Sequence, residues 1–328
     1  MLRSKGKKIT VTSRLGKVTY ERAYYYDPEE RRGYYPFDQQ LGVKGGISEG
    51  VVRIVVKLSA QSGRARCIRG SSRCSSQRGR DSPRQLDNAV GQPLPTMKET
   101  LESAACVMDG FMANVRAEGW KEVKIFEAYV TGQSGQVRGR SQSYVMHLGG
   151  PAFKLAMEAQ ARRWSQAAQS AVVGDGAAWI WNLAARDCPD AAHIVDWYHA
   201  KQHLCAAAEL LYPSQPEQAA AWVDQHSAML YEGQAKQIAK RLAQHTQSEQ
   251  LLTEARYFHE RMQYRDFESA HLPIGSGIVE SGAKQAKQRL CAPGMRWSRA
   301  GLENMLLLRA ALMSGTFDQL WPRICPRL

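Results

Sequence analysis

A run of residues from Gln61 to Arg84 divides this chain into two well-patterned parts. The run contains seven Arg, six Ser and three Gly, and Ile68 is its single bulky aliphatic residue. Such a segment buries too little apolar surface to offset the entropy of ordering, so it predicts an irregular basic linker. A second interpretation is translation in a shifted reading frame, which also explains the abrupt change in pattern. In either case the hydrophobic cores must form on the two sides of this run.

The positive charge of the chain is concentrated before residue 99. Residues 1–98 carry 20 Lys and Arg against 8 Asp and Glu, whereas residues 99–328 carry 24 against 23. A polyanionic partner explains this excess, because each cation near a phosphate releases condensed counterions. The alternative is a solvated basic tail.

The distribution of apolar residues and cysteines excludes several classes of protein. No apolar run approaches the roughly 20 residues needed to cross a bilayer. No apolar segment follows the basic N-terminus as it would in a secretory signal. The seven cysteines never form a C-x-x-C pair, which indicates reduced thiols rather than disulfides or a zinc ribbon. We therefore expect a cytoplasmic protein that makes no use of a membrane.

The residues after 98 alternate between short apolar runs and helical patterns. Strands are predicted at 104–108, 121–130, 143–148, 170–173 and 191–195, and helices at 152–169, 177–186 and 278–290. Residues 200–271 are helical in pattern throughout. The order β-β-β-α-β-α-β, then a helical insertion and a last helix, predicts an α/β fold of the ribonuclease H (RNase H)-like class, a mixed sheet with helices on both faces.

Five segments follow from this pattern. They are a partly folded, basic N-terminal region (1–60), the Arg/Ser-rich linker or frameshifted segment (61–98), the first part of the α/β core (99–206), the helical insertion (207–271), and the last part of the core with a C-terminal helix that includes Trp321 (272–328).

Three acidic residues stand where a ligand can reach them. Asp109 and Asp175 each follow a short apolar run and precede a glycine that supplies turn geometry, and Glu280 falls in the first turn of the helix predicted at 278–290. Carboxylate oxygens are the ligands that Mg²⁺ prefers. Two such ions about 4 Å apart clamp the attacking and leaving oxygens of a phosphoryl displacement. We expect these three acids to hold two Mg²⁺ ions, for which Mn²⁺ can substitute.

The sequence around these acids resembles the Kra-four family of bacterial insertion-sequence transposases. The resemblance is carried by residues 175–182 (DGAAWIWN), 196–200 (DWYHA), 273–281 (PIGSGIVES) and 294–298 (GMRWS), with support from 34–38 and 119–124. The D-x-x-H of Asp196 and His199 is also similar to a motif of the broader Mutator-like group, where it lies near the active site. Relatives carry a patterned helical segment where this chain has residues 61–84.

The resemblance implies a DDE transposase with a catalytic triad of Asp109, Asp175 and Glu280. Its activity would be divalent-metal-dependent cleavage at element ends and transfer of the 3′-OH into target DNA. The partner would be double-stranded DNA, with a homodimer in synapsis and association with the nucleoid. Two alternatives stay open: an RNase H-like nuclease or resolvase, and a decayed or repurposed DNA-binding remnant.

Further residues near these motifs are candidates for contact with DNA. Lys284, Lys287 and Arg289 follow Glu280 on its helix, and they either track the phosphate backbone or form a solvated face. Trp179 is a candidate for stacking on flipped bases, with packing between helix and sheet as the alternative. His199 and His203 have the spacing of a metal pair but lack a third ligand, so we expect His199 to hydrogen-bond a phosphate or an active-site carboxylate. The complete set of expected DNA contacts is Lys284, Lys287, Arg289, Arg296 and Trp179.

Overall fold

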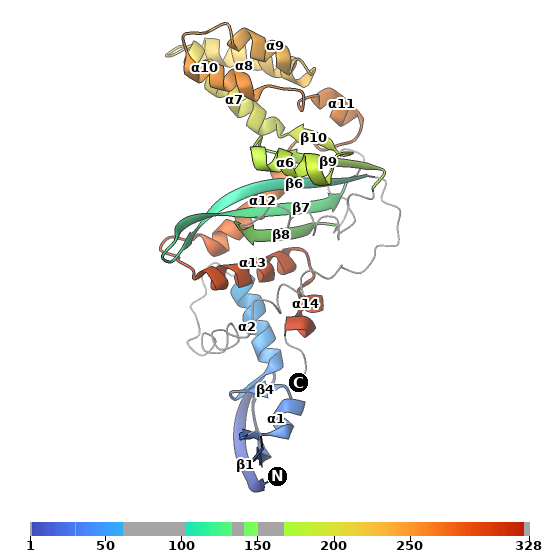
Figure 1. The fold of residues 1–328 in the computed structure, drawn as a ribbon, viewed down its shortest axis with the longest axis vertical. Helices are drawn as coiled ribbons and strands as arrows, with labels where there is room; N and C mark the ends of the chain where they lie inside the picture. Colours follow the sequence, from blue (N-terminus) through green and yellow to red (C-terminus); the bar gives the residue numbers. More distant parts are fainter. Residues whose placement is uncertain (1, 30, 62–102, 133–140, 150–166, 325–328) are drawn as a thin grey trace. The chain divides into compact units, whose positions relative to one another are not determined.

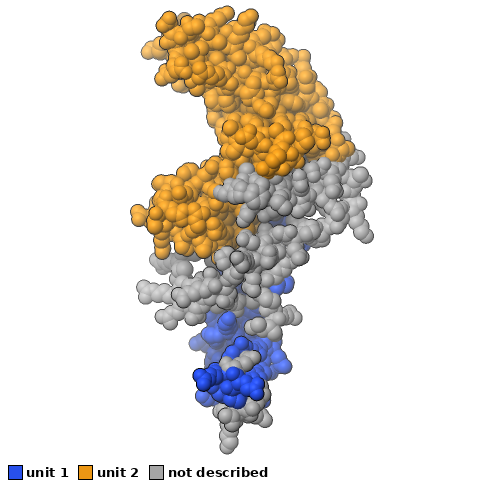
Figure 2. Space-filling model, in the orientation of Figure 1, with its two compact units in different colours: residues 1–91, 314–328 blue, residues 92–313 orange. Residues whose placement is uncertain are grey.

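The computed structural model describes residues 2–29, 31–61, 103–132, 141–149 and 167–324. The chain divides into two compact units, one of residues 1–91 and 314–328 and the other of residues 92–313 (Figure 2). The basic run at 61–84 and the helix predicted at 152–169 lie almost entirely outside the described residues.

The first unit is built on a long hairpin. Its sheet has the order β3-β2-β1-β5-β4. Strands β1 and β2 pair antiparallel, from Ser13 opposite Gly16 at the turn to Leu2 opposite Tyr26. The sequence pattern does not predict β1, because its lysines interrupt the apolar alternation. The elements are β1 (Leu2–Ser13), β2 (Gly16–Asp27), β3 (Arg32–Tyr34), α1 (Pro36–Gln40), β4 (Val43–Lys44), β5 (Ile47–Ser48), α2 (Glu49–Gln61) and α14 (Phe317–Ile324).

The C-terminal helix α14 packs with α2 in this first unit. The Arg53 guanidinium donates to Asp318 at 2.8 Å, and the Trp321 indole N–H donates to Glu49 at 3.0 Å. Trp321 was expected to close the core of the second part of the chain. The predicted segment 272–328 is thus divided between the two units, with residues up to 313 in the second.

The second unit contains a five-stranded mixed sheet of order β10-β9-β6-β7-β8 (Figure 1). Strands β6 (Ser103–Val115), β7 (Gly119–Val130) and β8 (Ser143–Leu148) form an antiparallel meander. Strands β9 (Gln169–Gly174) and β10 (Ala192–Val195) run parallel to β6. The carboxyl ends of β9 and β10 therefore meet at one edge of the sheet, beside the middle of β6.

Helices cover both faces of this sheet. Alternation along β6 puts Asp109 and Phe111 on one face of the sheet and Gly110 on the other. Lys124 of β7 pairs with Gly110 and therefore shares that second face. Helix α12 (Gly277–Leu290) contacts β6 and β7 on the first face, and α13 (Arg299–Met313) contacts β8. Helix α6 (Ala178–Asp187) lies on the opposite face, where the ring of Trp179 meets Lys124. The α/β class and this layering agree with the prediction.

The helical insertion forms its own cluster after β10. It consists of α7 (Trp197–Leu211), α8 (Pro216–Tyr231), α9 (Ala235–Leu242), α10 (Glu249–Tyr257) and α11 (Tyr264–Ser269). Helices α8 and α10 pack on α7, and α9 packs on both of them. Within the described ranges, every helix falls short of the length and hydrophobicity that a bilayer span demands.

One strand boundary differs from the prediction and matters for the site. The strand expected to end at Met108 continues through Asp109 and Gly110 to Val115, paired with β7 throughout. Gly110 is a strand residue opposite Lys124, so it does not form a turn. The prediction was wrong because it interpreted the Asp-Gly pair as a stop. The buried side chains of Phe111, Ala113 and Val115 continue the strand alternation beyond that pair.

Candidate metal centre

Asp175 is held at the end of β9 by a tight turn. Its Oδ1 accepts the Ala177 N–H at 2.9 Å, and its backbone carbonyl accepts the Tyr257 hydroxyl at 2.9 Å. Gly176 has φ +103°, and a Cβ there would lie 2.8 Å from the Tyr257 ring, so only glycine fits. The turn expected after Asp175 is therefore confirmed, and Tyr257, which the sequence did not suggest, supports it from α10.

Asp109 lies on β6, two residues beyond the last pair that joins β6 to β9. Burial raises the pKa of this carboxyl, the Gly110 amide and the charges of Lys287 and His199 lower it, and the charge of Asp175 raises it. The net effect is a raised pKa. Asp109 therefore shares one electrostatic environment with Asp175, His199 and Lys287, although it does not end its strand.

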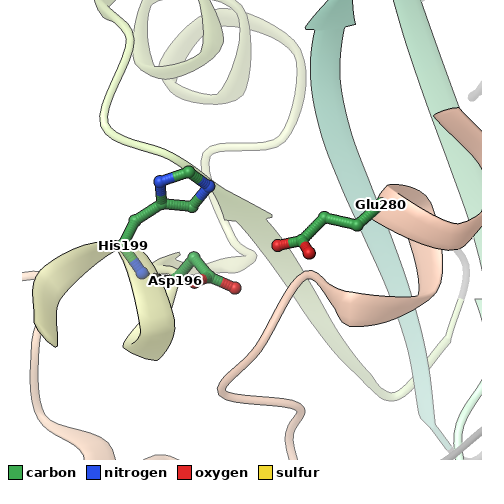
Figure 3. Close-up of side chains that lie close together, drawn as sticks. All are labelled: Asp196, His199 and Glu280. Atoms are coloured by element: carbon green, nitrogen blue, oxygen red, sulfur yellow. Dashed lines mark hydrogen bonds between the residues drawn. The ribbon is translucent and has the colours of Figure 1, made fainter. Parts of the chain in front are cut away.

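Glu280 lies in the first turn of α12, as expected, and meets the start of α7. Ligand atoms of Asp196, His199 and Glu280 all lie within 4.8 Å of one another. Figure 3 shows the Glu280 carboxylate directed from α12 toward the other two side chains. Asp196 is the N-cap of α7 and accepts the His199 N–H at 2.8 Å, and the Ser276 hydroxyl donates to Glu280 at 3.0 Å.

The structure therefore gathers the predicted acids in a different arrangement from the expected triad. Asp109 is coupled to Asp175, and Glu280 lies against His199. In the described part of the chain, Asp196, His199 and Glu280 form the one group of three or more candidate ligands with such short separations; Asp109 and Asp175 are not in it. The sequence signal for Asp196 is the D-x-x-H spacing, in which an aspartate N-cap binds the amide three residues later.

The donor set of this site fits a divalent cation. Four carboxylates and one imidazole offer mainly hard oxygen atoms, the ligands of Mg²⁺ and Mn²⁺. The pKa of Asp109 stays raised although Lys287 lies near it, so the local positive charge does not compensate for burial. A divalent cation would supply that compensation.

Three of the expected DNA contacts are exposed, and the other two pack against protein side chains. Lys284 and Lys287 are exposed on α12, and Arg296 is exposed before α13. Arg289 is only 6% exposed and lies over the Trp297 ring, so its expected contact with a phosphate is corrected to core packing. The Lys124 ammonium lies 3.6 Å from the centre of the Trp179 ring and covers one face of it. That arrangement favours the packing interpretation of Trp179 over base stacking.

His203 does not join His199 at the site. Its Nδ1 lies 2.6 Å from Glu254, and its ring stacks on Tyr257 at 3.5 Å. It thus supports the tyrosine that holds the Asp175 turn.

Comparison with known proteins adds no assignment to this site. No protein-family model matches the chain, and none of the curated proteins matches it. The chemistry of the site is therefore inferred from its donor atoms, their burial and their charges.

Proposed function

We propose that this chain is a DNA transposase with an RNase H-like catalytic core, which cleaves and joins phosphodiesters with the help of divalent cations. The order of elements supports the fold: a three-stranded meander, two parallel strands beside its first strand, a helical insertion and the helix that carries Glu280. The motifs that resemble the Kra-four transposases lie at the candidate metal centre, at Asp175, Asp196 and Glu280.

One observation carries the proposal. Acidic side chains from three elements far apart in the sequence, β6, the β9 turn and α12, reach the same edge of the sheet around His199. Asp109 and Asp175 are half-buried and Glu280 is exposed. Carboxylates gathered in this way repel one another unless a cation compensates for their charge. Phosphoryl transfer is the reaction for which such clusters are best suited, because their ions bind phosphate oxygens.

The residues of the site have distinct roles in this proposal. Asp109, Asp175 and Glu280 hold the ions, which when bound would acidify the attacking hydroxyl and neutralise charge on the phosphate. His199 donates a hydrogen bond to a phosphate oxygen of the scissile group. Lys284 and Lys287 lie on the exposed side of α12 and contact the DNA backbone beside it.

Replacing Asp175 with Asn tests the proposal. The variant should lose Mg²⁺-dependent cleavage of an element end by at least about a thousandfold, because one anionic ligand is removed. Binding to duplex DNA should change little, because in this proposal Asp175 binds an ion and makes no direct contact with phosphate. Asp224→Asn, at an exposed position on α8, is the control and should cleave normally. Cleavage by Asp175→Asn at the wild-type rate would refute the assignment.

The same assay separates transposase from the two alternatives. A transposase joins the freed 3′-OH of paired element ends to a second duplex, so the product carries a new phosphodiester. A nuclease or resolvase of this fold cleaves without that joined product. A DNA-binding remnant binds duplex DNA and does neither, with Mg²⁺ or with Mn²⁺.

A further inference from the structure

Asp196 lies where three parts of the second unit meet. It follows β10 and precedes α7, and it is fully buried. A buried carboxylate is tolerated when hydrogen bonds replace its hydration. The partners of Asp196 therefore show what its burial achieves.

One carboxylate oxygen of Asp196 serves its own helix and the other serves a distant one. Oδ1 accepts the His199 N–H at 2.8 Å, the ordinary bond of an N-cap. Oδ2 accepts the N–H of Ser276, the residue at the N-cap of α12. A second bond runs beside it, from the Trp197 N–H to the Ile274 carbonyl at 2.8 Å. The start of α7 is thereby joined to the start of α12 at two points.

The joined segments carry the candidate ligands. Ser276 is 3% exposed, and its hydroxyl donates to Glu280 at 3.0 Å, so the residue bound by Asp196 in turn orients Glu280. The backbone N–H of Asp196 donates to the Gly174 carbonyl at 2.8 Å, directly before Asp175. A single residue thus contacts both the strand end of Asp175 and the helix start of Glu280.

Close packing keeps this junction narrow. A Cβ on Gly275 would lie 3.3 Å from the Tyr198 ring and 3.7 Å from Asp196 Oδ2. The segment before α12 therefore runs close along the start of α7. Hydrogen bonds from backbone amides to a carboxylate are charge-assisted and stronger than neutral ones, so they resist displacement of this segment.

We propose that Asp196 is a positioning residue that fixes the separation of Asp175 and Glu280, and that it is not a ligand of the metal ions. Its short distance to His199 and Glu280 follows from this role, because both of its oxygens are already directed at backbone amides. The inference rests on the proposed function where it names Asp175 and Glu280 as ligands. The junction itself does not depend on that function.

Hydrogen exchange on the full chain tests the junction without metal or DNA. In Asp196→Asn an amide group replaces one of the two accepting oxygens, so amides of residues 274–280 should exchange at least about tenfold faster. Amides of α9 should be unaffected. Ser248→Ala, which removes the N-cap bond to Leu251 in α10, is the matched control and should accelerate exchange in α10 alone. Unchanged exchange at 274–280 would overturn the proposal.

The unaltered chain provides a measurement that no folding defect can affect. The amide of an N-cap residue has no partner within its helix and usually exchanges fast. With ¹⁵N-labelled serine, the Ser276 amide should exchange as slowly as amides in the interior of α12. Fast exchange there would also overturn the proposal.

Binding of Mn²⁺ alone separates positioning from ligation. Asp196→Asn should bind as many ions as the wild type with an affinity about tenfold weaker, because the ligands remain but are less well oriented. Loss of one ion would make Asp196 a ligand and contradict the proposal. If the wild-type chain binds no Mn²⁺, the proposed function fails, and the exchange measurements still decide whether Asp196 joins the two helices.

Discussion

At the scale of single residues, Glu127 is a buried carboxyl group that the candidate metal centre does not use. It lies on β7 between Val107 and Tyr144 of the neighbouring strands and is fully buried. Gln142 donates to its Oε1 at 2.9 Å. Burial raises the pKa of Glu127 to about 7, against the opposing hydrogen bonds from Tyr144 and Gln142. The native state therefore binds this proton more tightly than the unfolded chain does.

Replacing Glu127 with Gln should remove a pH dependence of stability. Because the pKa is raised on folding, the contribution of Glu127 is complete below its unfolded pKa of about 4.5 and is lost as the pH rises through about 7. The wild type should thus lose up to about 3 kcal/mol relative to Glu127→Gln between pH 4.5 and pH 8. Urea unfolding across this range measures the difference. Glu209→Gln, at an exposed position on α7, is the control and should show the pH dependence of the wild type. If the free energy of unfolding of Glu127→Gln changes with pH in parallel with that of the wild type, the prediction is wrong.

At the scale of elements, α12 shows what a sequence pattern can and cannot give. Successive helix residues turn by about 100°, so Lys284 and Lys287 fall on the side of Glu280, whereas Arg289 falls about opposite. The exposure of these residues follows that geometry. The expectation for Arg289 was wrong because charge was counted without its angular position. The alternation of residues in β6 could likewise have predicted that the strand continues through Gly110.

Helix α12 approaches β8 closely at Gly282, which gives a prediction of its own. A Cβ there would lie 2.6 Å from the Tyr144 ring, and that ring is buried. Gly282→Ala should destabilise the chain by about 1–2 kcal/mol, although alanine favours a helix by about 1 kcal/mol. Gly277→Ala on the same helix meets nothing within 4 Å and should be neutral or stabilising. Equal unfolding midpoints for the two variants would show that α12 does not pack tightly on β8.

At the scale of the whole molecule, local pattern predicted most elements but not their convergence. Among the described residues after 103, the positions of strands and helices depend on local periodicity, and they agree with the prediction to within a few residues, β6 excepted. The group formed by Asp196, His199 and Glu280 depends on hydrogen bonds between residues eighty positions apart, such as Asp196 and Ser276. No local pattern specifies such a contact. The five-stranded sheet of the first unit was missed because its central strand β1 carries Lys7 where the alternation of Ile9 and Val11 would place an apolar residue.

The charge of the whole chain leads to the last prediction, which concerns binding to DNA. The seven arginines between residues 61 and 84 account for much of the excess of cations before residue 99. Replacing all seven with Gln should reduce the slope of log K against log salt concentration by up to about six units, because each neutralised phosphate contributes about 0.9. Affinity should fall equally for an element end and for an unrelated duplex of the same length. Filter binding or fluorescence anisotropy at several salt concentrations measures both quantities.

The matched control replaces the same seven arginines with Lys, which keeps the charge and removes the planar guanidinium. Counterion release depends on charge, so this variant should keep the wild-type slope. Reading bases requires side chains held in a groove by an ordered element, so a loss confined to element ends would show that residues 61–84 read sequence. An unchanged slope in the Gln variant would place the phosphate contacts elsewhere, with Lys284, Lys287 and Arg296 of the second unit as the next residues to replace.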